Sequence, residues 1–202
     1  TVPALTCTIG GQAVTAYSSA WIGIDGDGSQ TVEQDGTEQD CDDGTPDYYA
    51  WYEMYGDNSV DDGYAVPLSK TVKAGDAMTA SVSYSGERWT LSISDSTESW
   101  TYSKQIAEPT QNVPAQASAE WIVELPQIDG DDSNPLADFG TARFTSATAT
   151  VSTGSGTSTG PASEWNSGAI DMVNSGLTDV MAATYAFDDT GEDFSDIWEN
   201  SD

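Results

Sequence analysis

Short runs of aromatic and β-branched residues, each closed by a turn signal, recur along almost the whole chain. The clearest runs are SAWIGI, YYAWYEMY, AMTASVSY, RWTLSISD, SAEWIVEL and ARFTSATATVS. Stretches rich in glycine and aspartate, such as GDGS, DDGTPD, KAGD and YSGE, separate these runs and favour turns. Strands of this length and spacing predict an all-β fold, either a sandwich or a barrel.

The chain has 202 residues, which is enough for one large β-sandwich. We expect one domain over residues 1–187. The remainder, 188–202, reads DDTGEDFSDIWENSD and predicts a solvated acidic tail, because it has many acids and few apolar residues. The segment 152–161, STGSGTSTGP, predicts a flexible loop from its composition.

Two other segments differ in how clearly their apolar residues predict a structure. SVSYSGERWTLSIS predicts a hairpin that turns at Ser85-Gly86, with Trp89, Leu91 and Ile93 on one face. Residues 167–187, SGAIDMVNSGLTDVMAATYAF, fit neither the helical nor the strand period cleanly, and we interpret them mostly as strand.

The charge of the chain excludes several classes of function. It has 34 acidic and five basic residues, a formal net charge of -29, and no basic stripe, so nucleic acid and anionic membrane surfaces are not expected partners. It has no histidine, which argues against a serine–histidine triad or a zinc hydrolase. Asp and Glu lose their charge in acid and few cations remain to repel one another, so we expect a fold that tolerates acid and weakens toward neutrality.

Cys7 and Cys41 are the only cysteines. Two isolated cysteines without histidine make a poor metal site, and the chain is rich in Ser, Thr, Gly and Asp but poor in Lys, as extracellular proteins often are. We therefore expect a Cys7–Cys41 disulfide, with two buried free thiols as the alternative. We expect no metal and no cofactor, and we expect a secreted, extracellular protein.

The period of two along each run predicts which side chains share a face. Val32 and Gln34 fall on the same side of a short strand, an unusual place for an uncharged amide in so acidic a chain. Glu120 and Glu124 share a face in SAEWIVEL. The remaining pairs are Trp21 with Asp25 and Trp51 with Glu53. If these strands are neighbours, carboxylates gather beside tryptophans, where acid–base chemistry is favoured, although a solvated sheet face would show the same spacing.

Several motifs together, in the order SAWIGIDGDG, EQDG, YYAWYEMY, SAEWIVEL, LADFGTARFTSATA and GP, resemble the glutamic peptidase family, also called eqolisins. The resemblance extends from about residue 1 to residue 185. It implies a sandwich of two bent antiparallel sheets, concanavalin-like in shape, and a secreted, acid-acting, pepstatin-insensitive endopeptidase.

The resemblance also implies the site residues. The glutamine of EQDG is Gln34 and the last glutamate of AEWIVE is Glu124, and these positions correspond to the catalytic pair of the family. Glu120 matches a recurrent position that is not catalytic. The residues that correspond to the lining of the family's active cleft, and so to substrate binding, are Trp21, Asp25, Trp51 and Glu53.

An amide and a carboxylate suit peptide hydrolysis. Glu124 can accept a proton from water and later deliver it to the leaving nitrogen, while Gln34 can hold the water and donate to the oxyanion without titrating. A glycoside hydrolase or a carbohydrate-binding lectin of similar shape is the alternative, because paired acids and tryptophans also suit sugars. A calcium loop at DGDG, residues 25–28, is weaker because the further spaced acids are missing.

The chain departs from the family pattern at three places. Family members carry a preceding segment that ends in FTVP, whereas this sequence begins at TVP; the resemblance thus implies that an N-terminal strand is either absent or supplied by a separate light chain or propeptide. Tyr49 replaces the aspartate that precedes AWYE, and a cysteine that follows the IDGD motif in the family is missing. Protein or peptide substrates are the other expected partners.

Overall fold

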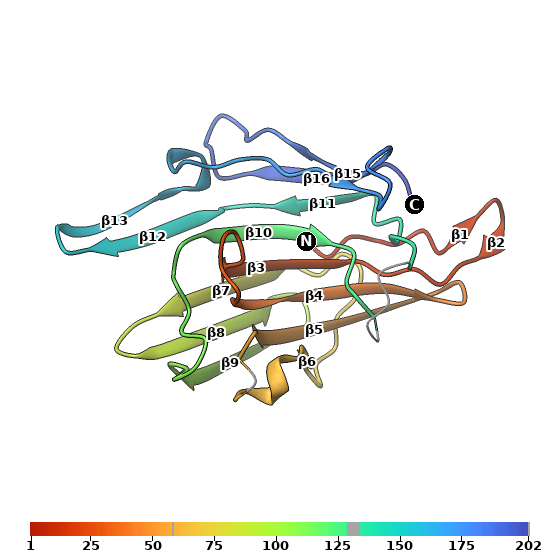
Figure 1. Ribbon diagram of the computed structural model, residues 1–202. Helices are drawn as coiled ribbons and strands as arrows, with labels where there is room; N and C mark the ends of the chain where they lie inside the picture. The colour runs from red at the N-terminus through yellow and green to blue at the C-terminus, as the bar shows by residue number, and fades with distance from the viewer. Residues whose placement is uncertain (58, 129–133, 202) are drawn as a thin grey trace.

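The computed structural model describes residues 1–57, 59–128 and 134–201 (Figure 1). In these ranges the chain forms strands in antiparallel sheets and two short 3₁₀ turns, η1 (Asp61–Gly63) and η2 (Ala162–Glu164). The expected all-β class is confirmed. The described chain contains no helical segment with the length and hydrophobicity that a membrane span requires.

A five-stranded sheet forms the centre of the molecule, in the order β10-β3-β4-β5-β6. Its strands are β3 (Ser19–Asp25), β4 (Val32–Asp42), β5 (Thr45–Tyr55), β6 (Val66–Pro67) and β10 (Ala119–Glu124). The two longest strands, β4 and β5, are paired along their whole length from Val32–Tyr55 to Asp42–Thr45. This long ladder fixes which side chains of the two strands lie opposite one another.

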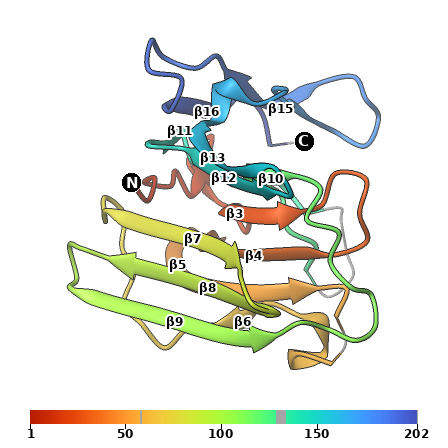
Figure 2. The ribbon, with the colours of Figure 1, turned by 90° about the vertical axis from the view of Figure 1, so that its left-hand side faces the viewer.

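A three-stranded sheet covers one face of the five-stranded sheet (Figure 2). Its strands are β7 (Met78–Tyr84), β8 (Arg88–Asp95) and β9 (Trp100–Ala107). Trp89, Leu91 and Ile93 are at most 1% exposed and pack against residues of β5 such as Ala50 and Met54. The predicted hairpin and its apolar face are confirmed, and each of these large side chains contributes about 1.5–3 kcal/mol by leaving water.

The C-terminal part forms a four-stranded sheet in the order β11-β16-β15-β14. Its strands are β11 (Thr141–Phe144), β14 (Met172–Val173), β15 (Val180–Tyr185) and β16 (Phe194–Trp198). Residues 167–187 form a strand pair, β14 and β15, and no helix, but fewer than half of them are in strands, so the mostly-strand interpretation is wrong in its extent. The expectation of a solvated tail over 188–202 is wrong for β16, which lies between β11 and β15, although Asp202 is outside the described residues. Pairing on both sides orders this segment despite its acidity.

The hairpin of β12 (Thr148–Thr153) and β13 (Gly156–Pro161) occupies the segment expected to be a flexible loop. That expectation is wrong because the small polar residues face one another across the ladder. The hydroxyls of Thr150 and Thr159 are 2.8 Å apart, and those of Ser152 and Thr157 are 3.0 Å apart. Composition predicts flexibility here, but cross-strand hydroxyl pairs support a strand pair.

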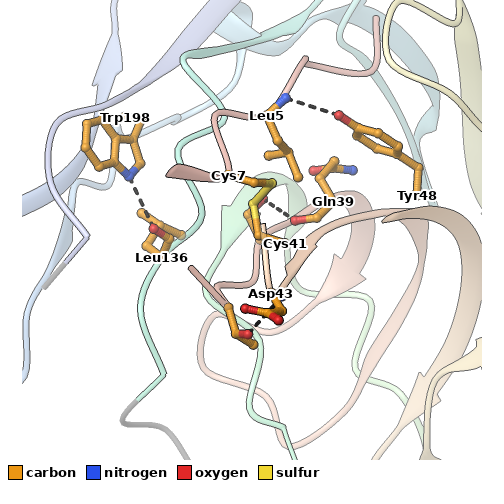
Figure 3. Close-up of a disulfide and its surroundings, with 10 residues drawn as sticks. Leu5, Cys7, Gln39, Cys41, Asp43, Tyr48, Leu136 and Trp198 are labelled. Atoms are coloured by element: carbon orange, nitrogen blue, oxygen red, sulfur yellow. Dashed lines mark hydrogen bonds between the residues drawn. A yellow bond between two sulfur atoms is a disulfide. The ribbon is translucent and has the colours of Figure 1, made fainter. Parts of the chain in front are cut away.

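The N-terminal segment, with β1 (Thr8–Ile9) and β2 (Gln12–Ala13), is tied to the end of β4. The Cys7–Cys41 disulfide is present, as expected from the sequence (Figure 3). Beside it, the backbone N–H of Leu5 donates to the hydroxyl of Tyr48 on β5 at 3.1 Å. The disulfide and this bond hold the start of the chain against the central sheet.

Candidate active site

The two faces of the five-stranded sheet differ in what they contact. We call the face against β7, β8 and β9 the core face, and the opposite one the site face. Because opposed residues in an antiparallel pair point the same way, the register identifies the members of the site face. They are Glu120, Ile122 and Glu124 on β10; Ser19, Trp21, Gly23 and Asp25 on β3; Val32, Gln34, Gly36, Glu38, Asp40 and Asp42 on β4; and Thr45, Asp47, Tyr49, Trp51, Glu53 and Tyr55 on β5.

Gly36 lies at the centre of the site face. It is opposite Trp21 on one side and Trp51 on the other. A Cβ atom at Gly36 would lie 2.5 Å from both the Ala20 carbonyl oxygen and the Trp21 Cβ, so only glycine leaves room for the backbone and side chain of β3 at this point. The absence of a side chain here lets Trp21 pack closely on β4. The Trp21 indole N–H donates to Glu124 Oε2 at 2.8 Å.

Gln34 is held from one end of its amide. It lies directly opposite Glu53, and its Nε2 donates to Glu53 Oε2 at 2.6 Å. Gln34 is 6% exposed, and its Oε1 has no hydrogen-bond partner within the described residues. The Trp51 indole N–H is also buried without a partner there. A buried acceptor and a buried donor on one face are thus available to a bound molecule.

Three glutamates of the site face interact electrostatically. Burial raises the pKa of Glu53 to about 7; the bond from Gln34 opposes this and the charge of Glu124 adds to it. Burial, followed by the charge of Asp40, raises the pKa of Glu38 to about 9, with smaller contributions from Glu124 and Glu53. Glu124 lies on β10 and Glu53 on β5, with β3 and β4 between them, yet the charge of Glu124 contributes to the pKa of Glu53.

Glu124 is the carboxylate with a hydrogen bond from an indole. Burial raises its pKa above the ordinary value, and the bond from Trp21 opposes that rise. This environment keeps the group within reach of both protonation states in acid, which general acid–base chemistry requires. Gln34 and Glu124 flank the central row of Trp21, Gly36 and Trp51 from opposite sides.

The structure brings together most of the expected site residues. Trp21, Gln34, Trp51, Glu53 and Glu124 all belong to the site face. The period of two predicted which side chains share a face within each strand. The sequence alone left open whether the strands were neighbours, and the sheet order answers that question.

Asp25 has a different environment from the substrate-facing position implied by the resemblance. It is 0% exposed, and its two carboxylate oxygens accept hydrogen bonds from the backbone N–H groups of Gln116 and Ala117. Asp25 therefore anchors the segment that leads into β10 and so helps to position Glu124. Glu120 accepts from the backbone N–H of Asp27 at 2.7 Å and makes no hydrogen bond to the Gln34 amide.

Two further acids of the site face were missed. Glu38 and Asp40 lie on β4 and have buried carboxylate oxygens without a partner among the described residues. Burial, then the charge of Asp47, raises the pKa of Asp40 to about 7. The signal was present in the sequence, since Gln34, Glu38 and Asp40 are all separated by even numbers of residues.

The described residues contain no group of three or more His, Cys, Asp or Glu side chains arranged to hold a metal ion. The chain has no histidine, and Asp25 of the DGDG segment is engaged by backbone N–H groups. The chemistry of this face is thus that of carboxyl, amide and indole groups.

The site face thus combines a glutamine amide with several carboxyl groups on one sheet of an antiparallel β-sandwich. Comparison with known proteins identifies the family: the chain belongs to the Peptidase A4 family, whose model matches residues 1–190. Aspergillopepsin-2 of Aspergillus niger is 33% identical over 136 residues, which is 66% of this chain and 46% of that protein. The chain thus spans about half the length of this curated relative.

Solved structures confirm the sandwich. The crystal structure of aspergilloglutamic peptidase from Aspergillus niger has a TM-score of 0.72 and 26% identity, and the match covers 91% of this chain and 99% of that one. Scytalido-glutamic peptidase, solved with a peptide-based transition state analog, has a TM-score of 0.69 over 98% of this chain and 89% of that one. At 20% identity this second likeness shows the fold alone.

Proposed function

We propose that the protein is an acid endopeptidase that hydrolyses peptide bonds with Glu124 and Gln34. The observation that carries this proposal is the site face itself, on which a buried amide with an unpartnered oxygen and a carboxylate bonded by an indole flank a glycine floor. Membership of the Peptidase A4 family supports it independently.

Glu124 acts as the general base and then as the general acid. In its ionised form it takes a proton from the attacking water, and the protonated form later gives that proton to the leaving nitrogen. The Trp21 N–H stabilises the ionised form and fixes the orientation of the carboxylate. One residue can perform both steps because the tetrahedral intermediate collapses at the place where the water was activated.

Gln34 acts through both ends of its amide. Its unpartnered Oε1 accepts a hydrogen bond from the attacking water, and the Nε2 proton not given to Glu53 donates to the developing oxyanion. The amide has no charge to lose across the working pH range. Trp21 and Trp51 form the surrounding surface to which a peptide binds.

The proposed working range is acid because of the carboxyl groups around the dyad. Glu38 and Glu53, with pKa values raised to about 9 and about 7, are neutral in acid and do not repel a peptide carbonyl that is gaining negative charge. At neutral pH, ionisation of Glu53 places a second charge near Glu124. Turnover should therefore decline as the pH rises toward 7.

Cleavage of a denatured protein in acid, measured with and without pepstatin, tests the proposal. We expect cleavage at internal peptide bonds that pepstatin does not prevent. The same preparation is offered a β-glucan at the same pH. Hydrolysis of the glucan without cleavage of protein would instead support the glycoside hydrolase alternative.

We also propose that an additional polypeptide segment, an N-terminal light chain or propeptide, completes the sandwich. A groove of about 2210 Å³ is lined by residues of β3, β7, β10, β11 and β12. Within the described chain, β7, β10 and β11 each pair on one side only. Three free strand edges beside one groove can accept extended chain by β-strand addition.

Co-expression of this chain with a candidate light-chain or propeptide segment tests that second proposal. We expect a complex that survives gel filtration and protects the β10 and β11 amides from hydrogen exchange. Unchanged exchange at both strands would contradict it. Secretion, which the disulfide supports, is tested by finding the protein in the culture medium of its source.

A further inference from the structure

We infer that Glu53 is a positioning residue that decides which end of the Gln34 amide faces the reacting atoms. This inference rests on the proposed function, and it differs from the substrate-binding role that the family resemblance implies for Glu53. The juxtaposition behind it is a carboxyl group directly opposite a catalytic amide on the neighbouring strand.

The contact between the two side chains is short and well supported by the backbone. Gln34 and Glu53 are register partners in the longest ladder of the molecule, and Nε2 lies 2.6 Å from Oε2. The flanking residues of β5, Tyr52 and Met54, are buried in the core at 3% and 1% exposure. Because the strand on which Glu53 lies is fixed from its other face, its carboxyl group is a rigid reference for the amide.

A glutamine side chain needs such a reference. Its amide has an NH₂ end and an oxygen end of nearly the same shape, and only hydrogen-bond partners choose between the two orientations. A Glu53 oxygen that carries no proton accepts but does not donate, so it holds the NH₂ end of Gln34 beside Glu53 and sends the Gln34 Oε1 away. That oxygen is the buried atom without a partner within the described residues.

The proposed chemistry depends on this orientation. With Oε1 toward the site, Gln34 offers an acceptor to water and still keeps one Nε2 proton for the oxyanion. In the reversed orientation the Gln34 Oε1 would lie beside Glu53 Oε2, and this arrangement would need a proton on Oε2 itself, the oxygen that accepts from Gln34. Small errors in the position of a catalytic group reduce turnover more than substrate affinity, since binding draws on many other contacts.

The groups that face Glu53 determine its response to pH. Gln34 and Glu38 lie on β4, and Glu124 lies on β10. Burial and the charge of Glu124 raise the pKa of Glu53 to about 7, so in acid its carbonyl oxygen accepts from Gln34 and its charge is absent. A glutamine at position 53 reproduces that neutral form at every pH.

Three variants separate positioning from substrate binding. Glu53→Ala removes the acceptor, and we expect kcat on a peptide substrate in acid to fall by about 10-fold to 10²-fold while KM changes by less than about 3-fold. Glu53→Gln keeps an oxygen that accepts from Nε2, so it should restore kcat to within about 3-fold of wild type in acid. Glu120→Gln is the matched control. Glu120 is in register with Gly23 and, through it, with Gln34 on the same face of the sheet, but it makes no bond to Gln34. This variant should behave as wild type.

The pH profile gives a readout that a purely structural role would not move. In wild type, the decline of kcat at high pH includes the ionisation of Glu53. Glu53→Gln should move this decline to higher pH. A loss confined to KM in Glu53→Ala would overturn the inference in favour of substrate binding. Equal impairment of Glu53→Gln and Glu53→Ala, or wild-type kcat in both, would also overturn it.

A spectroscopic measurement keeps this test independent of the proposed reaction. In ¹⁵N-labelled protein, the Gln34 side-chain NH₂ resonances, assigned from their loss in Gln34→Ala, should show one proton shifted downfield and protected from exchange. Glu53→Ala should abolish both properties, whereas Glu53→Gln should retain the protection. If these signals behave as expected while Gln34→Ala is fully active, the proposed function fails and the positioning contact stands; unshifted signals in wild type would refute the contact itself.

Discussion

The site face and the core face of the five-stranded sheet both bury carboxyl groups, but they do so with different neighbours. On the core face, Glu33 and Asp35 are 0% exposed and have no hydrogen-bond partner for their carboxylate oxygens within the described residues. On the site face, Glu53 and Glu124 each accept a hydrogen bond from a neighbouring strand. A raised pKa is common to both faces, so it does not by itself identify the site.

The difference lies in the convergence of different functional groups. Strand β4 alternates, sending Glu33 and Asp35 toward the core and Gln34 and Glu38 toward the site. Gln34 bonds Glu53 of β5, and Glu38 is affected by the charges of Glu124 and Glu53. Burial raises the pKa of Glu33 to about 8, with a further contribution from Asp25, and the same cause raises that of Asp35. We therefore expect the core acids to affect stability and the site acids to affect turnover.

The largest expected effect is on turnover at the site face. Gln34→Ala removes the amide that holds water and oxyanion, and kcat in acid should fall by about 10²-fold to 10³-fold with little change in thermal stability. Steady-state cleavage of a peptide and a melting curve at the same pH measure the two quantities. Asp35→Asn, one residue away on the core face, is the control and should keep kcat; equal loss in both variants would erase the distinction between the faces.

Removal of the disulfide should reduce stability strongly, and this effect should not distinguish the two faces of the sheet. Cys41 lies near the end of β4, and its bond to Cys7 links two residues that are 34 positions apart in the sequence. Replacing both cysteines with alanine should reduce the free energy of unfolding by about 3–4 kcal/mol in denaturant titration. The molecules that remain folded should keep wild-type kcat. Intact mass after alkylation without reduction should show no added groups in wild type, and two alkylated thiols would contradict the bond.

A smaller and pH-dependent effect is expected on the core face. The folded-state pKa of Glu33 is raised from 4.5 to about 8, so between these values the folded chain holds a proton that the unfolded chain has lost. The stability contributed by this proton is fully present below about pH 4.5 and is lost as the pH rises toward 8. The melting temperature of wild type should decrease over that window, and Glu33→Gln should flatten the decrease. A wild-type melting temperature higher at pH 8 than at pH 4 would contradict the acid-adapted interpretation.

The smallest effect is expected for a carboxyl group that shares the site face without joining the dyad. Glu120 bonds the Asp27 backbone and the Ser118 hydroxyl, and an amide oxygen can accept the same bonds. Glu120→Gln should therefore keep kcat within about 2-fold of wild type, since surface changes of this kind cost little. A loss as large as that of Gln34→Ala would transfer the catalytic assignment from Glu124 to Glu120.

The sequence predicted the parts of the molecule in which local pattern and tertiary position agree. Alternation placed Trp89, Leu91 and Ile93 on a buried face and put Gln34 on the side of Val32, and both placements are confirmed. The disulfide followed from the number of cysteines and the composition.

The errors arose where distant strands decide the outcome. β16 is ordered by pairing with β11 on one side and β15 on the other, and the acidic composition of β16 itself does not reveal these partners. The β12–β13 hairpin is supported by hydroxyl pairs that composition alone does not reveal. Asp25 was assigned to the cleft by its motif, but its partners, Gln116 and Ala117, lie about 90 residues away in the sequence and fold back to it.

The central claim, that the site face is catalytic and the core face is not, is tested most directly by one substitution made on each face. Glu124→Gln and Glu33→Gln both exchange a carboxyl group for an amide of the same size. In one acid assay on a denatured protein, with folding verified by circular dichroism, Glu124→Gln should reduce cleavage to background and Glu33→Gln should cleave at the wild-type rate. Wild-type cleavage by folded Glu124→Gln would contradict the account.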